Sequence, residues 1–173
     1  GDPGKSRNWC DRVLMADPDA EVAMRNILLN LAYETHDPAM VFAEHQRYGA
    51  RYAHPHGMAV KPHGNLPDPN RRLRIGYLSY DFRNHAVARN LRPVLMAHDH
   101  RRVEIFCYAC SDITDSITAN FQQCADHWRP VAELSDDAIA DRIRADGIDI
   151  LVSLAGRFDG NRPLVCARRP API

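Results

Sequence analysis

Leu73 to His85 reads LRIGYLSYDFRNH, and this stretch decides the fold. Its first part, 73–79, is an apolar run with a glycine inside it, which is typical of a central parallel strand that another segment or a ligand approaches closely. Polar residues follow where this strand should end, and ligands bind outside the carboxyl ends of strands in open α/β sheets. We therefore expect a functional cleft beside Asp81, Asn84 and His85.

The rest of the C-terminal region alternates between strand and helix patterns. Further strands are expected at 103–109 and 148–154, with a short one near 128–131. Helices are expected at 86–98, 114–126 and 136–146, the last opened by Ser135 and closed by Gly147. This alternation predicts an α/β fold with a mostly parallel, Rossmann-like sheet and right-handed crossovers.

Two different regions precede this sheet. Residues 1–52 are expected to form a helical segment, with a hairpin over 17–52 that is capped first by Asp17 or Asp19 and then by Asp37. Residues 53–72 contain four prolines, two glycines and three histidines without an apolar period, which predicts a linker or an ordered surface loop. The domain boundaries expected from the sequence are therefore 1–52, 53–72 and 73–173.

Composition excludes several classes of function. The chain has 173 residues, 45% of them hydrophobic, and its 22 basic residues balance its 22 acidic ones. Without a net charge, neither nucleic acid nor a membrane surface is implied as a partner. No apolar stretch approaches the roughly 20 residues that span a bilayer, and the N-terminus lacks a signal-peptide core, so we expect a cytoplasmic protein. The chain has five cysteines, and an odd number in a chain without a secretory signal favours reduced thiols over a framework of disulfide bonds.

Two clusters suggest metal or redox chemistry, and neither is a strong candidate. Cys107 and Cys110 fall on a predicted strand, where positions three apart point to opposite faces and could share neither a metal nor a bond. His54, His56 and His63 are more simply explained as surface histidines of the proline-rich region. We expect no metal site.

Four segments in this order carry a family resemblance. They are LRIGYLSYDFRNH (73–85), VEIFCYAC (103–110), ADHWRPVAELSDDAIADRIRADGIDILVSLAG (125–156) and GNRPLVCARRPAPI (160–173). In order and spacing they resemble the catalytic region of the O-linked N-acetylglucosamine transferases and their SPINDLY-like and bacterial relatives. The resemblance implies a GT-B architecture, in which two Rossmann-like domains face each other. It also implies that the chain stops inside the first of them, lacks the C-terminal catalytic lobe and is inactive alone.

The resemblance further implies a function and roles for particular residues. The longer protein would transfer N-acetylglucosamine from UDP-GlcNAc to serine or threonine hydroxyls of protein acceptors, with inversion and without a cofactor or metal. His85 matches a histidine close to the reaction centre, and Asp81 and Asn84 accompany it. Gly156 and Arg157 belong to a second loop that would contact substrate. The helical segment 1–52 would be the end of a tetratricopeptide array that selects acceptors.

Departures from the family pattern leave two alternatives open. Arg157 and Phe158 stand where the family usually has histidine or tyrosine and then threonine, and Ala155 replaces a polar residue. A non-catalytic binding module on a degenerate scaffold would account for these losses. A different Rossmann-type nucleotide binder is disfavoured, because the first strand is not followed by the G-x-G-x-x-G turn.

Overall fold

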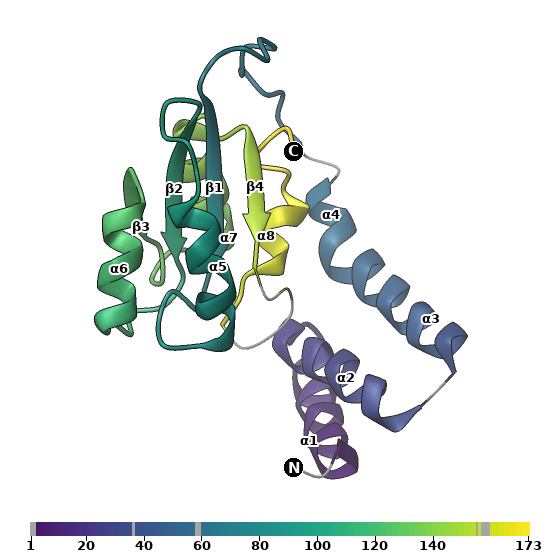
Figure 1. Ribbon diagram of the computed structural model, residues 1–173. Coiled ribbons are helices and arrows are strands. Elements are labelled where there is room, and N and C mark those ends of the chain that lie inside the picture. The colour runs from purple at the N-terminus through teal and green to yellow at the C-terminus, as the bar shows by residue number, and fades with distance from the viewer. Residues whose placement is uncertain (1–2, 36, 58–59, 155, 157–159) are drawn as a thin grey trace. The chain divides into compact units, whose positions relative to one another are not determined.

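The chain forms two compact units, seen in a computed structural model that describes residues 3–35, 37–57, 60–154, 156 and 160–173. The first unit comprises 1–59 and the second 60–173 (Figure 1). Each has hydrophobic core residues of its own. No described helix is both long and apolar enough to cross a membrane.

The first unit is helical. Its elements are α1 (Pro3–Ala16), α2 (Glu21–Glu34), α3 (Pro38–Tyr48), a π-helical turn (Gly49–Ala53) and α4 (His54–Gly57). Helix α1 lies within the helical segment expected over 1–52, but before the hairpin expected at 17–52. Helical structure continues five residues past residue 52. Cys10 of α1 packs against Ala23 and Ile27 of α2.

The predicted N-terminal cap is correct for α3 and wrong for α2. Asp37 caps α3 as expected, accepting a hydrogen bond of 2.9 Å from the Ala39 N–H. The expected Asp17 or Asp19 cap of α2 is wrong, because Ala20 occupies that position without a side-chain bond. The Asp17 carboxylate instead accepts from the Asp19 N–H, which closes a turn before the helix.

The second unit is a parallel α/β sandwich, which confirms the expected fold class. Among its described residues the strands are β1 (Leu73–Ser79), β2 (Val103–Ala109), β3 (His127–Pro130) and β4 (Ile150–Ser153). They lie side by side in the order β3-β2-β1-β4 and pair in parallel throughout. The helices are α5 (Ala86–Met96), α6 (Ser116–Cys124), α7 (Asp136–Ala145) and α8 (Pro163–Ala167).

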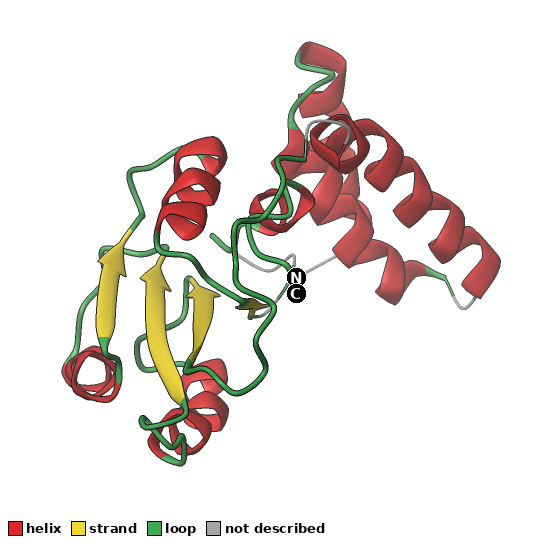
Figure 2. Ribbon diagram, turned by 90° about the horizontal axis from the view of Figure 1, so that it is seen from above, coloured by secondary structure: helices red, strands yellow, loops and turns green. Residues whose placement is uncertain are grey.

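Helices cover both faces of this sheet (Figure 2). Side chains alternate between the two faces along each strand, so each face has its own core. The core beneath α5 and α6 contains Tyr77, Phe82, Leu91, Leu95, Ile105, Cys107 and Phe121. The core beneath α7 and α8 contains Leu78, Phe106, Tyr108, Cys110, Ile139, Ile143, Ile148 and Val165.

The cysteine pair is therefore divided between the two faces, as the strand periodicity predicted. All five cysteines of the chain are free thiols. Burial raises the pKa of both Cys107 and Cys110, the latter to about 12, so both remain protonated at neutral pH.

Gly76 shows why a glycine interrupts the apolar run of β1. A Cβ atom at this position would lie 3.1 Å from the Tyr108 ring, 3.2 Å from Ile148 and 3.3 Å from Leu151. The segment that approaches this strand closely is therefore the protein's own core and not a ligand.

Residues 60–72 are anchored to the sheet through Asp149, which immediately precedes β4. The Asp149 carboxylate accepts hydrogen bonds from the Arg71 guanidinium, from Asn65 at 2.5 Å and from the Arg74 N–H at 2.8 Å. Burial alone would raise the pKa of Asp149, but these donors outweigh it and hold the pKa at about 2. This stretch is thus an ordered part of the second unit.

Candidate functional site

Asp81 is the buried centre of the loop that leaves β1. Its side chain is 1% exposed, and its Oδ1 lies 3.5 Å from Arg83 Nη2 and 3.7 Å from His85 Nδ1. Its N–H donates to the Ser79 hydroxyl at 2.9 Å, which tightens the exit from the strand. A buried carboxylate needs a cation or hydrogen-bond donors, and this loop supplies the Arg83 guanidinium as the cation, while Asp81 Oδ1 receives no hydrogen bond from the residues that the structure describes.

His85 is the N-cap of α5 and remains about one-third exposed. Its Nδ1 accepts from the Val87 N–H at 3.3 Å, which assigns the neutral ring proton to Nε2. Asp81 lies near the same nitrogen. In the other neutral tautomer the proton is on Nδ1, which gives up the bond from Val87 and faces the Asp81 carboxylate, and Nε2 is then free to accept a proton from another group.

Asn161 joins the loop after β4 to the loop after β1. It is buried, its Oδ1 accepts from the Tyr80 N–H at 3.0 Å, and its Nδ2 lies 3.5 Å from Asp81 Oδ2. The Tyr80 ring also covers Gly160 so closely that any side chain there would overlap it. Sequence reasoning missed the role of Asn161, although an amide after a glycine in an expected site loop is a usable signal.

Asp115 joins a third loop to this edge. Its Oδ2 accepts from the Asn84 N–H at 2.7 Å, and its Oδ1 caps α6 through the N–H groups of Ile117 and Thr118. Hydrogen bonds from the backbone of Asn84 and Thr118 lower the pKa of Asp115. The D-x-x-T capping pattern was available in the sequence as a signal for this helix start. The Asn84 side chain itself is exposed.

The second expected loop is described only in part. Gly156 has a φ of +51°, a left-handed conformation that suits glycine, and nothing lies within 4 Å of where its Cβ would be. Arg157 lies outside the described residues, as do Ala155 and Phe158. The substrate-binding roles expected for Gly156 and Arg157 therefore stay predictions.

A cavity of about 440 Å³ opens beside His85. It runs along one side of α5 towards α6 and is lined by Asn84, His85, Ala88, Arg89, Arg92, Pro93, Met96, Ala97 and Ile117. Most of the lining surface is apolar, and the polar side chains in it are those of Asn84, His85, Arg89 and Arg92. Two of the sequence-predicted residues thus share one cavity.

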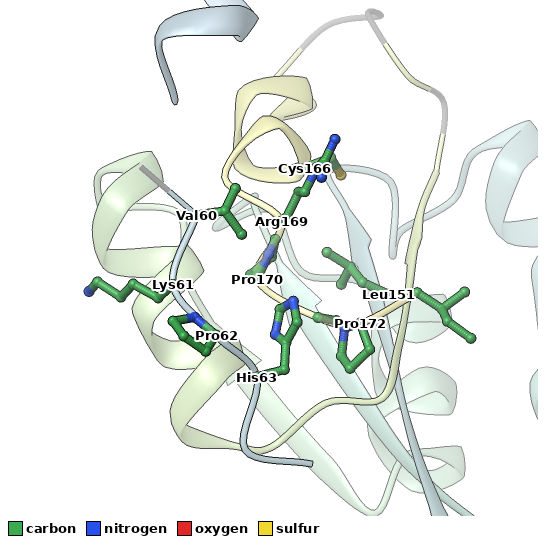
Figure 3. A pocket seen from close by; sticks show the side chains of 11 residues that line it. Val60, Lys61, Pro62, His63, Leu151, Cys166, Arg169, Pro170 and Pro172 are labelled. Carbon is green, nitrogen blue, oxygen red and sulfur yellow. The ribbon is translucent and has the colours of Figure 1, made fainter. Parts of the chain in front are cut away.

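A second cavity, of about 630 Å³, lies beside β4 (Figure 3). It is bounded by 60–63, by Leu151 and by 169–173, and Asp81, Asn84 and His85 are not among its lining residues. Ile173 forms backbone hydrogen bonds with Asp149 and Leu151 at its edge. No group of three or more metal-ligating side chains occurs in the part of the chain that the structure describes.

The fold and this edge define a class of protein. A histidine, a buried carboxylate and an amide gather where the strands of this parallel α/β unit end, which is the edge where open α/β sheets bind ligands. The family model of glycosyl transferase family 41 matches residues 51–173, and the chain belongs to this family. The resemblance noted from the sequence is thereby confirmed, and the different Rossmann-type binder is set aside.

Individual relatives agree with this assignment. The chain is 41% identical over 124 residues to the probable UDP-N-acetylglucosamine-peptide N-acetylglucosaminyltransferase SEC of Arabidopsis thaliana, covering 70% of this chain and 12% of that protein. It is 32% identical over 163 residues to the probable UDP-N-acetylglucosamine-peptide N-acetylglucosaminyltransferase SPINDLY of the same plant. This match covers 91% of this chain and 18% of that protein. A solved mutant O-GlcNAc transferase from Thermobaculum terrenum matches with a TM-score of 0.91 at 35% identity, covering 99% of this chain and 33% of that one.

The chain thus spans between about an eighth and a third of the length of these relatives.

Proposed function

We propose that this chain is part of a glycosyltransferase that transfers N-acetylglucosamine from UDP-GlcNAc to serine or threonine hydroxyls of proteins. The observation that carries the proposal is the pairing of His85 with buried Asp81 at the carboxyl end of β1, in a chain that belongs to glycosyl transferase family 41. The names of the two Arabidopsis relatives describe transfer from UDP-N-acetylglucosamine to peptides, which supports the same donor and acceptor here.

His85 would act as the general base in this reaction. As the acceptor oxygen forms its bond to the anomeric carbon and the bond to the diphosphate breaks, the hydroxyl proton passes to the imidazole. Asp81 would orient the ring and stabilise the imidazolium, because its Oδ1 lies 3.7 Å from Nδ1. The displacement inverts the configuration at the anomeric carbon, and UDP leaves with the bonding electron pair.

The remaining parts of the reaction belong to protein that this chain does not contain. We assign the stabilisation of the departing diphosphate to a C-terminal catalytic lobe, so the 173-residue chain alone should transfer nothing. The helices of 1–59 would be the end of a tetratricopeptide array that presents acceptors. No metal or other cofactor is part of the proposal, and the nucleotide sugar is a substrate.

A non-catalytic binding module is the second candidate. The specific observation in its favour is the loop sequence Ala155, Arg157 and Phe158, which replaces polar side chains usual in the family. Such a module would keep the scaffold and bind a nucleotide sugar or a protein without transferring sugar.

The test is transfer of radiolabelled N-acetylglucosamine from UDP-GlcNAc to a serine peptide by the longer natural protein. We expect label in the peptide, and none when the serine is replaced by alanine. Donor binding without transfer, measured by calorimetry on the same protein, would establish the binding module in its place. Label transferred only from another nucleotide sugar would overturn the proposed donor.

A further inference from the structure

The cavity beside His85 contains features that the transfer chemistry does not require. Its floor is apolar, made by Ala88, Pro93, Met96 and Ile117. Met96 is 62% exposed although it belongs to an amphipathic helix with a well-filled core on its other side. Met96 therefore contributes exposed apolar surface to a cavity that two arginines also line.

Arg89 and Arg92 line the same cavity and lack a carboxylate partner. Neither guanidinium has a hydrogen bond or an ion pair with any residue that the structure describes. Arg83 nearby is paired with Asp81, and Arg74 in β1 with Glu104. Arg89 does not stabilise α5 electrostatically. It is the fourth residue of the helix, and a cation near a helix N-terminus opposes the helix dipole.

Pro93 interrupts the hydrogen-bond ladder of α5 beside the cavity. Proline has no N–H, so the carbonyl of Arg89, four residues earlier, does not receive the usual helical hydrogen bond. Arg89 and Pro93 both line the cavity. An apolar floor and two unpaired cations together match a polypeptide with acidic side chains.

We propose that this groove binds the acceptor polypeptide next to its reacting hydroxyl, and that Arg89 and Arg92 select acceptors with an acidic residue close to the serine or threonine. The inference rests on the proposed function, because it takes His85 as the point where the hydroxyl sits. Along a helix that rises about 1.5 Å per residue, the two arginines lie roughly 6 and 10 Å from His85. An extended peptide covers about 3.3 Å per residue, which places the preferred carboxylate two to three residues from the hydroxyl.

The first test measures acceptor selectivity in the longer natural protein. Two serine peptides are compared. One has glutamate at the third residue before and the third residue after the serine, and the other has glutamine at both positions. We expect kcat/KM to favour the glutamate peptide by about tenfold, and Arg89→Gln/Arg92→Gln to reduce this ratio to near one. The matched control is Arg102→Gln, an exposed arginine outside this cavity, which should keep the ratio. Equal rates for both peptides in the unaltered protein, or a ratio that survives the double substitution, would overturn the proposal.

The second test does not depend on sugar transfer. In ¹⁵N NMR spectra of the 173-residue chain, the glutamate peptide should shift the amides of Arg89, Met96 and Ile117, and the glutamine peptide should shift them less. UDP is titrated separately. If UDP shifts the same amides and the peptide does not, the groove holds a nucleotide and the inference is wrong. If the peptide shifts them but the longer protein transfers no sugar, the proposed function fails while the binding groove stands.

Discussion

At the scale of single residues, the candidate site depends on a carboxylate that is taken out of water. The Asp81 side chain is 1% exposed, and burying a charge in this way is costly unless cations or donors surround it. Arg83 and His85 come from the same loop and lie within 4 Å of it, whereas Asn161 comes from the other end of the second unit. The first two were recognisable from sequence proximity. Asn161 was not, because only the folded sheet brings residues 80 apart together.

Gly76 carries the first prediction at this scale. Gly76→Ala should destabilise the chain by about 1–3 kcal/mol, because the new methyl group would press on Tyr108, Ile148 and Leu151 at 3.1–3.3 Å in a well-packed core. Urea denaturation measures the change in the free energy of unfolding. The matched control is Gly64→Ala, where nothing lies within 4 Å of the added atom. Equal stability of the two variants would show that the core accommodates the methyl group.

At the scale of elements, strands with continuous apolar runs were predictable, whereas helix α1 was expected only as part of a helical segment over 1–52 and not as a separate element. The predictions for 73–79 and 103–109 match β1 and β2, because buried central strands leave an uninterrupted apolar pattern. β3 begins one residue earlier than expected, and β4 is shorter than expected at both ends. Helix α1 begins with proline, glycine and charged residues, and its apolar side becomes recognisable only once it packs on α2.

The anchoring of 60–72 by Asp149 gives a prediction about pH. The pKa of this carboxylate is about 2 in the folded chain, below its ordinary value of 3.8. As the pH falls the unfolded chain takes up the proton first, so the stabilisation is complete above about pH 4 and is lost towards about pH 2. The lowered pKa should contribute roughly 2 kcal/mol to the free energy of unfolding, because one pKa unit corresponds to about 1.4 kcal/mol. The Asp149 side chain is only 8% exposed, so solvent screens this contribution little.

The measurement is the free energy of unfolding of the unaltered chain and of Asp149→Asn, at about pH 6 and about pH 2.5. We expect a clear deficit for the variant at the higher pH that becomes much smaller at the lower one. Asp141→Asn is the control, because that side chain is 59% exposed and should change stability little. A deficit of equal size at both pH values would mean that the charge of Asp149 is not what anchors the segment.

At the scale of the whole molecule, the sequence indicated the fold class but not the strand order. Alternating strands and helices predict a parallel sheet, yet the order β3-β2-β1-β4 depends on which helix packs on which face. The site follows from that order. Because β4 lies next to β1, the loop containing Asn161 meets the loop containing Asp81.

The division into two units predicts independent folding of the second. Residues 60–173 expressed without 1–59 should unfold cooperatively in urea, because both faces of their sheet have complete cores of their own. Circular dichroism and tryptophan fluorescence should report the same midpoint, since Trp128 lies in this unit. A broad transition, or different midpoints from the two signals, would contradict independent folding.

The most direct test of the account is the rate of N-acetylglucosamine transfer by the longer natural protein with His85→Ala. We predict that kcat falls by about 10²-fold or more while the KM for UDP-GlcNAc changes little, because His85 removes the acceptor proton. The control is His100→Ala, whose ring is 44% exposed beside Asp126, away from the loop that leaves β1, and which should transfer at the unaltered rate. A His85→Ala protein that transfers as fast as this control would remove His85 from the mechanism and contradict the assignment of the active site to this edge of the sheet.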